Sequence, residues 1–273
     1  MFGFPQNIGN TGYQMSSSPS SAPIPFGALQ SPARRLDAGP VGFPTSWRPT
    51  LIAGCLLWLD AADDNNFTLG TGSRVSQWKD KSGNASHFTQ TTEAYQPLRD
   101  SWQNGLPTVR QALNTGLTRA AISHTNCTQF LVSRINTWSP TSGRDIFCTG
   151  STGGIGPVLQ VNGALRVGYV CQNIAFVQAA TYPTPTGFVL QELTRSGNIV
   201  TLHLNGVLAM SGSTAMNAPA GNAYVVGSPA GGGAGNFNNF QDVAELIVYN
   251  TALSTQDRIT VEQYLRRKWA IVG

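Results

Sequence analysis

The segment that most constrains the fold of this chain lies near its C-terminal end, between Ala244 and Trp269. Its first residues, AELIVYN, form an apolar run typical of a buried strand, and a short turn follows. Ser254, with Asp257 three residues later, then predicts the capped start of a helix. The sequence therefore predicts a strand followed directly by a helix.

The predicted helix has one apolar face and a basic end. The apolar stripe consists of Val261, Tyr264, Leu265 and Trp269. Basic residues at 266–268 suit the negative end of the helix dipole, and we attribute them to it rather than to a ligand. Because a helix with one apolar face must lie on another surface, we expect it to pack on the sheet formed by the rest of the chain.

The preceding residues read as short strands separated by turns. The predicted strands are 51–60, 75–80, 130–135, 146–149, 158–170 (folded at its Asn–Gly pair), 188–194, 199–204, 207–210 and 224–226. Asn205-Gly206 also lies between apolar runs, which is the strongest short signal for a hairpin. Many short strands with one helix predict a mainly β protein, an antiparallel β-sandwich of the jelly-roll kind with one C-terminal helix.

Residues 1–50 differ in composition from the rest of the chain. They contain eight of the 16 prolines, no lysine and a single acidic residue, Asp37. No hydrophobic period is present, so we expect an extended Pro/Ser/Gly-rich arm, with the β-sandwich occupying residues 51–273. The expected anchors of the arm on neighbouring subunits are Phe2, Phe4, Phe26, Leu29, Phe43 and Trp47.

Charge and hydropathy indicate which kinds of molecule the chain can bind. Charged residues make up 11% of the chain, against roughly 25% in ordinary soluble domains, so the expected surface is polar and uncharged and suited to lying against neighbours. The net charge of +4 is dispersed without a basic run, which predicts no nucleic-acid partner. No apolar run is long enough to span a membrane, and the N-terminal residues lack the pattern of a signal peptide.

The cysteines do not suggest a metal site or a disulfide framework. They are Cys55, Cys127, Cys148 and Cys171, without CxxC or Cys/His spacing. An even number permits two disulfides, but a chain of this length does not need them, so we expect mostly buried free thiols.

Three motifs in order carry a resemblance to a known family. These are LLWLDAADDNN with VSQWKDKSGN, then IVTLHLNGVL, and finally AELIVYNTALSTQDRITVEQYLRRKW. Together they resemble the laminin-G/concanavalin A-like jelly-roll domain, as found in structural proteins of phages and large DNA viruses and in bacterial surface proteins. The resemblance covers about residues 51–271 and implies two antiparallel sheets with the helix packed on the sandwich. It implies little about function, because this fold carries lectins, enzymes, adhesion modules and capsid parts.

The sequence predicts a protein that is not an enzyme. Glycosidases of this fold family carry acidic residues on alternating positions of one strand, and no such strand is present among the four glutamates. Glu245 has no acidic residue two positions away, and simple alternation places Asp242 on the opposite face. The histidines are isolated and expected to be structural, and His203 is expected to face outward from its strand. We therefore assign no catalytic residue and no cofactor.

A calcium site is a weaker hypothesis. Oxygen donors gather in one loop, and many laminin-G relatives bind calcium at a rim of the sandwich; the donors are Asp60, Asp63, Asp64, Asn65 and Asn66. Their spacing is not that of an EF-hand. Asp and Asn also form turns and cap strand ends, so we assign no metal ligand.

A sugar site is also considered. Exposed aromatic side chains in polar loops could stack on sugars, and Trp102, Trp138 and Tyr182 are the candidates. The alternative is that these aromatic residues pack in the core or at the rim.

Two functions follow from these observations. The first is a virion structural protein, a minor capsid, cement or decoration subunit that is made in the host cytoplasm and contacts coat proteins through its arm. The second is a carbohydrate- or receptor-binding adhesin module of a viral tail or fibre, with a host glycan as its partner. An adhesion module of a cell surface is a third option, which the missing signal peptide disfavours.

Overall fold

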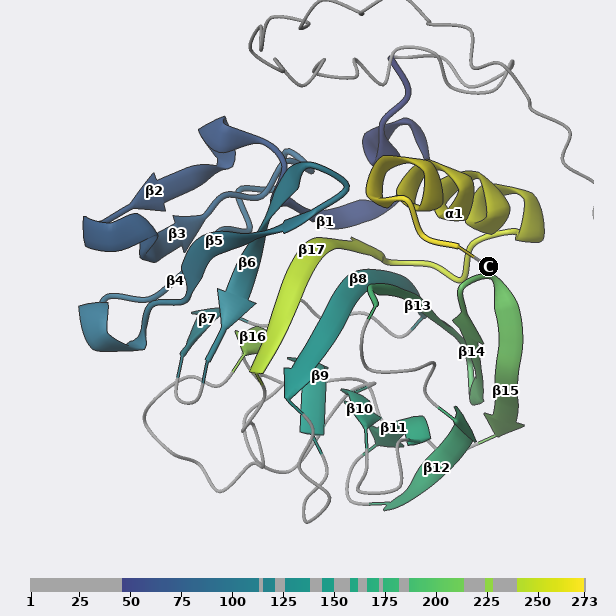
Figure 1. Ribbon diagram of the computed structural model, residues 1–273. Coiled ribbons are helices and arrows are strands. Elements are labelled where there is room, and N and C mark those ends of the chain that lie inside the picture. The colour runs from purple at the N-terminus through teal and green to yellow at the C-terminus, as the bar shows by residue number, and fades with distance from the viewer. Residues whose placement is uncertain are drawn as a thin grey trace, which may run out of the picture. The chain divides into compact units, whose positions relative to one another are not determined.

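A computed structural model gives the architecture (Figure 1). It describes residues 46–112, 115–120, 126–137, 144–149, 158–161, 166–171, 174–181, 187–213, 224–227 and 240–272. The chain separates into two compact units, Met1–Pro40 and Val41–Gly273, and every described residue belongs to the second. The predicted boundary between an arm and a sandwich at residue 50 remains a prediction.

The described residues form two antiparallel sheets, which confirms the predicted mainly β sandwich. The eight-stranded sheet has the order β15-β14-β13-β8-β17-β6-β5, with β1 also pairing with β17. Its strands are β1 (Cys55–Asp60), β5 (Leu98–Gln103), β6 (Leu106–Gln111), β8 (Cys127–Thr137), β13 (Val189–Ser196), β14 (Ile199–Leu204), β15 (Val207–Ser213) and β17 (Phe240–Tyr249).

The second sheet has nine strands in the order β12-β11-β10-β9-β16-β7-β4-β3-β2. These strands are β2 (Phe67–Leu69), β3 (Val75–Trp78), β4 (Phe88–Thr89), β7 (Gly116–Arg119), β9 (Arg144–Thr149), β10 (Val158–Val161), β11 (Arg166–Cys171), β12 (Ile174–Thr181) and β16 (Tyr224–Gly227). Short 3-10 turns, η1 (Pro49–Leu51), η2 (Asp64–Asn66), η3 (Thr71–Ser73) and η4 (Glu93–Tyr95), connect some of the elements.

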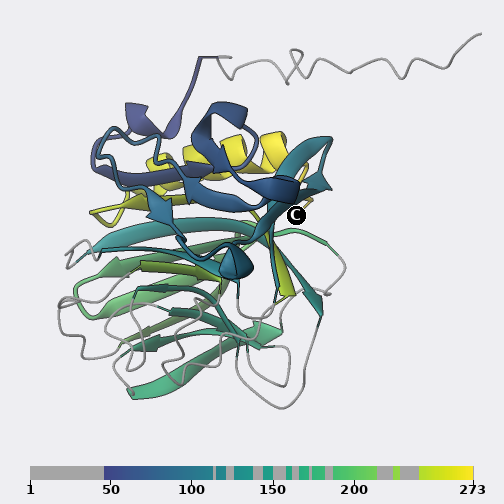
Figure 2. The ribbon, with the colours of Figure 1, turned by 90° about the vertical axis from the view of Figure 1, so that its left-hand side faces the viewer.

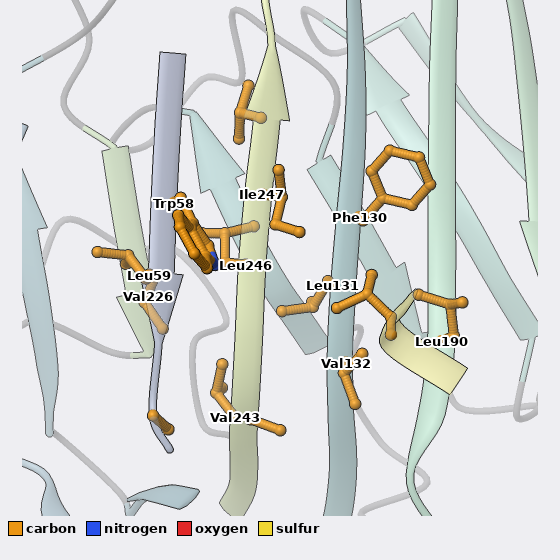
Figure 3. Packing of buried hydrophobic residues seen from close by; sticks show 14 of the residues in the cluster. Trp58, Leu59, Phe130, Leu131, Val132, Leu190, Val226, Val243, Leu246 and Ile247 are labelled. Atoms are coloured by element: carbon orange, nitrogen blue, oxygen red, sulfur yellow. The ribbon is translucent and has the colours of Figure 1, made fainter. Parts of the chain in front are cut away.

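Aliphatic side chains from both sheets form the core. On the inner face of the eight-stranded sheet, Leu59, Leu246 and Leu131 stand opposite one another on β1, β17 and β8, and all three are completely buried. Figure 3 shows these leucines beside Val226, which the nine-stranded sheet contributes. Of the strand predicted at 51–60, only Cys55–Asp60 forms β1, whose residues 57–60 are buried; Leu51 lies in the turn η1 and is exposed.

The helix α1 (Thr255–Trp269) covers the outer face of the eight-stranded sheet (Figure 2). The Ser254 side chain accepts a hydrogen bond from the Asp257 amide at 3.1 Å, as the capping pattern predicts. Val261, Leu265 and Trp269 are completely buried, which confirms the predicted apolar stripe. Both faces of this sheet are therefore shielded from solvent around β17.

Candidate functional site

An exposed tryptophan marks the hairpin formed by β5 and β6. Trp102 lies on β5, the last strand at one edge of the eight-stranded sheet, and its side chain is 62% exposed. Its cross-strand neighbour on β6 is Pro107. An indole of this size usually gains more from burial than from exposure, so its position identifies a surface available for contact.

The tip of this hairpin is fixed to the end of α1. Asn104 and Gly105 both have positive φ, 52° and 73°, as the two-residue turn of a tight hairpin requires. The Gln103 amide donates to the carbonyl of Trp269 at 2.7 Å, and the Asn104 amide donates to that of Lys268 at 2.9 Å. These bonds satisfy carbonyls that a helix end leaves without partners, and they hold the strand that carries Trp102 in place.

Charged groups lie on the same hairpin. The guanidinium of Arg110 on β6 pairs with the carboxylate of Asp100 on β5, and both side chains are partly exposed. Asp100 is two residues from Trp102 along β5. Trp102 stands opposite Pro107, and Arg110 lies three positions further along β6, so alternation places the Arg110 side chain and the indole on opposite faces of the hairpin. We call Trp102 and its cross-strand neighbour Pro107 the hairpin site.

The structure can be compared with the sugar-binding candidates from the sequence. Trp102 was expected in or near a polar loop, and it lies on β5, two residues before Asn104 of the hairpin turn, where it is exposed. Trp138 and Tyr182 lie outside the described residues. The Asn104-Gly105 pair is the signal that could have located this hairpin, because it has the same form as Asn205-Gly206.

Of the predicted arm anchors, only Trp47 falls among the described residues. Its ring packs on that of Tyr264 in α1, with 5.0 Å between the centroids. The neighbouring Pro49 carbonyl accepts a hydrogen bond from the Tyr249 hydroxyl at 3.0 Å. The start of the described chain is therefore tied to its own sandwich, and the docking of the arm on other subunits remains a prediction.

The residues considered for calcium do not fit a calcium ion. The ammonium group of Lys81 lies between two of the carboxylates, 2.9 Å from Asp60 and 2.8 Å from Asp63. Asp64 is paired with Arg99 at 2.5 Å. Lysine and arginine thus neutralise the negative charge that a cation would need. Across the described residues, no group of three or more His, Cys, Asp or Glu side chains is arranged to hold a metal ion.

A buried charged cluster lies between β1, β17 and α1. At its centre is Glu245, completely buried, whose carboxylate accepts four hydrogen bonds. The donors are Trp58 Nε1 (2.7 Å), Tyr264 Oη (2.9 Å), Trp269 Nε1 (2.7 Å) and Lys268 Nζ (2.7 Å). We name Asp60, Glu245 and Lys268 with these aromatic side chains the charged cluster.

Burial sets the protonation behaviour of the charged cluster. Loss of solvation raises the pKa of Glu245, although the Lys268 ammonium opposes the effect. Burial also disfavours ionisation of Asp60, but the charges of Lys268 and Lys81 outweigh it and hold the pKa of Asp60 below its usual value. Burial likewise raises the pKa of the Tyr264 hydroxyl well above its usual value.

The position of Lys268 corrects one prediction from the sequence. The helix dipole was expected to account for the basic residues at 266–268. The ammonium of Lys268 instead reaches into the sheet, 2.5 Å from Asp60 Oδ1 and 2.7 Å from Glu245 Oε2. The periodicity of a helix identifies which of its residues face a sheet, but it does not show that the sheet carries buried carboxylates at that position.

Two further predictions concerned the outer face of the sheet, and the one about Asp242 was wrong. Strand β17 has a bulge between Val243 and Glu245. As a result, the cross-strand partners of Asp242 and Glu245 on β8 are Arg134 and Val132, which are two positions apart. Asp242 and Glu245 therefore lie on the same face. His203 faces outward from its strand, as predicted, because Leu202 and Leu204 point into the core, but its side chain is only 14% exposed.

His203 is covered because α1 lies on the outer face of its strand. Its Nδ1 is 3.2 Å from the buried Glu192 Oε1, and the other oxygen of Glu192 accepts from Arg258 of the helix at 2.9 Å. His87 has a structural contact, since its Nδ1 accepts from the amide of Asp80 at 3.1 Å. His124 lies outside the described residues.

Comparison with known proteins finds similarity of fold. No protein-family model and no curated protein matches the chain. Among solved structures, it is similar to Trypanosoma rangeli sialidase in complex with sialic acid (TM-score 0.59, 11% identity), covering 81% of this chain and 34% of that one. It is also similar to the binding domain of Paraclostridial Mosquitocidal Protein 1 (TM-score 0.58, 12% identity), covering 80% of this chain and 53% of that one. The chain thus spans about a third to a half of the proteins it matches, and at these identities the matches establish a β-sandwich fold.

These matches contradict the prediction that the chain is not an enzyme. A further match is a covalent intermediate of the same sialidase (TM-score 0.59, 12% identity). The prediction excluded catalysis because no strand carries the expected carboxylates, but sialidases use a tyrosine nucleophile and do not depend on that pattern. The absence of a strand with paired carboxylates therefore does not exclude catalysis, and we withdraw the prediction that the chain is not an enzyme.

Proposed function

We propose that the chain is a carbohydrate-binding module and that glycans bind at the hairpin site. The observation that carries this proposal is Trp102, an indole 62% exposed on a hairpin that two hydrogen bonds fix to α1. A flat aromatic surface can stack on the apolar C–H face of a sugar ring. Because the strand is already held in place, little conformational entropy is lost on binding.

The ion pair between Asp100 and Arg110 spans the same two strands, and both of its side chains are partly exposed. Its carboxylate can accept hydrogen bonds and its guanidinium can donate them. Because Arg110 leaves the face opposite to Trp102, the proposed sugar contact is carried by the indole and not by this ion pair.

The similar proteins support this function over the virion role. One is described as a sialidase in complex with sialic acid, and another as the binding domain of a toxin. We further propose that the sandwich is of the laminin-G/concanavalin A-like kind, as the sequence motifs suggest. The proteins reported above are not coat proteins, so a virion location and coat-protein partners remain predictions from the sequence.

A glycan array with the full chain tests the proposal. We expect binding to a defined group of glycans and a loss of affinity of at least about tenfold in Trp102→Ala, equivalent to about 1.4 kcal/mol. Leu208→Ala is the matched control, because Leu208 is 56% exposed on β15 at the opposite edge of the same sheet. A blank array, or equal losses in the two variants, would overturn the proposal.

A further inference from the structure

Three reactive side chains from separate elements meet in the charged cluster. Lys268 Nζ of α1 lies 2.5 Å from Asp60 Oδ1 of β1 and 2.7 Å from Glu245 Oε2 of β17. Asp60 and Glu245 are direct cross-strand partners, so their side chains leave the same face of the sheet. The Lys268 amine and the Asp60 carboxyl group are thus held together beside the Glu245 carboxylate, which can transfer protons between them.

The surroundings of this group are largely dry and aromatic. Asp60 is 4% exposed and Glu245 is completely buried. Trp58, Tyr264 and Trp269 all donate hydrogen bonds to Glu245, and the Lys268 ammonium also lies 5.2 Å from the centre of the Trp269 ring. Bulk water therefore has little access to the bond between Asp60 and Lys268.

We propose that Lys268 and Asp60 become joined by an intramolecular amide bond, which links α1 covalently to β1. The starting ion pair contains the atoms of the product plus one water. The ammonium and the carboxylate give a secondary amide and H₂O, without any oxidant or other reactant. The N–C bond forms between Lys268 Nζ and Asp60 Cγ, and the bond from Cγ to Oδ1 breaks.

Each neighbouring group has a role in this step. Glu245 accepts a proton from the Lys268 ammonium, which frees the amine to attack, and then passes the proton to the departing Oδ1. A second proton from Nζ completes the water molecule, and the third stays on the amide nitrogen. Lys81, 2.9 Å from Asp60 Oδ2, stabilises the negative charge that develops on that oxygen during attack.

Burial also favours the product over the ion pair. Two opposite charges taken out of water carry a desolvation cost that a neutral amide does not share. After the reaction, Glu245 keeps the hydrogen bonds from both indoles and from the tyrosine, so its charge is still stabilised. Lys81 keeps Asp63 as a partner at 2.8 Å.

The decisive experiment is the intact mass of the full chain, measured after unfolding under reducing conditions. We expect a mass lower than that of the sequence by one water. Proteolytic mapping should then give one branched peptide that joins the segment of Asp60 to the segment of Lys268. A mass equal to that of the sequence, or a branch at Lys81 instead, would overturn the proposal.

Variants separate the chemistry from the fold. Lys268→Arg should have its full sequence mass, and Asp60→Asn should lose ammonia in place of water if its amide reacts at all. Glu245→Gln keeps the size of the side chain and should stay at full mass while its circular dichroism remains native. A crosslink in folded Glu245→Gln would exclude Glu245 as the proton carrier. The mass of the unmodified chain decides the proposal even if every variant fails to fold.

Discussion

The two faces of the eight-stranded sheet are both buried, but their chemistry differs. The inner face is lined by leucines such as Leu59, Leu131 and Leu246, which meet the second sheet. The outer face, beneath α1, buries Asp60, Glu245 and Lys268 among aromatic rings. Aliphatic packing tolerates rearrangement, whereas each buried charge needs its own partner at a definite place. The inner face therefore supplies stability, and the outer face determines how α1 docks.

The strongest test of this contrast removes the centre of the outer face. Glu245→Ala leaves the Lys268 ammonium and two indole N–H groups without their partner. We expect the free energy of unfolding to fall by about 4 kcal/mol, as measured by urea denaturation. A loss below about 1 kcal/mol would mean that the outer face does not determine the docking of the helix.

The matched change on the inner face is at the adjacent residue. Leu246→Ala creates a cavity in the aliphatic core and should cost about 3 kcal/mol in the same assay. Its pH profile should run parallel to that of the unmodified chain, because no titrating group is lost. If Leu246→Ala changes the pH dependence and Glu245→Ala does not, the proposed division between the faces is wrong.

Acid should act on the outer face. The pKa of Asp63 is lowered, chiefly by its hydrogen bond from Lys81. Because this folded-state value lies below the unfolded value of about 3.9, its stabilisation is present above pH 4 and is lost as the pH falls through the folded value. We expect Asp63→Asn to reduce the free energy of unfolding by about 0.5 kcal/mol at pH 7, with the difference disappearing at pH 2. A constant difference between these pH values would contradict this assignment.

The smallest effect concerns a thiol at the end of the outer face. Cys55 pairs with Tyr249 across β1 and β17. Burial, and next the negative charge of Asp80, raise the pKa of Cys55 to about 12. Because the thiolate is the reactive form, iodoacetamide at pH 8 should label Cys55 rapidly only after unfolding, as followed by peptide mass spectrometry. Equal labelling rates in native and unfolded chains would show that this part of the face is open to solvent.

The sequence could predict the elements that bury aliphatic residues. Long apolar runs gave β1, β8 and β17, and the apolar stripe with its capping serine gave α1. The strands β5 and β6 were missed, because Leu98–Gln103 and Leu106–Gln111 mix charged and apolar residues without regular alternation. Residue propensities do not identify these two strands, because the hairpin is held by contacts with α1.

The charged cluster could not be predicted for a different reason. Alternation shows that a residue leaves the aliphatic face of a strand, but it does not show whether the opposite face meets water or a helix. The outward direction of His203 could therefore be predicted, but the helix that covers it could not. The bulge in β17 moved Asp242 to the face of Glu245, and a bulge leaves little trace in a single sequence. For Trp102, the sequence left open whether the ring is exposed or packed, and it did not show the fixed hairpin that carries it.

The contact between Asp60 and Lys268 joins residues 208 positions apart. During synthesis, β1 leaves the ribosome long before the helix that supplies the ammonium group of Lys268. Asp60 therefore lacks this partner until almost the whole domain has been made. A chain interrupted before residue 268 would leave Glu245 without a cation and the outer face of β17 uncovered. This sandwich can therefore bury the outer face of β17 only after the segment that forms α1 has been made.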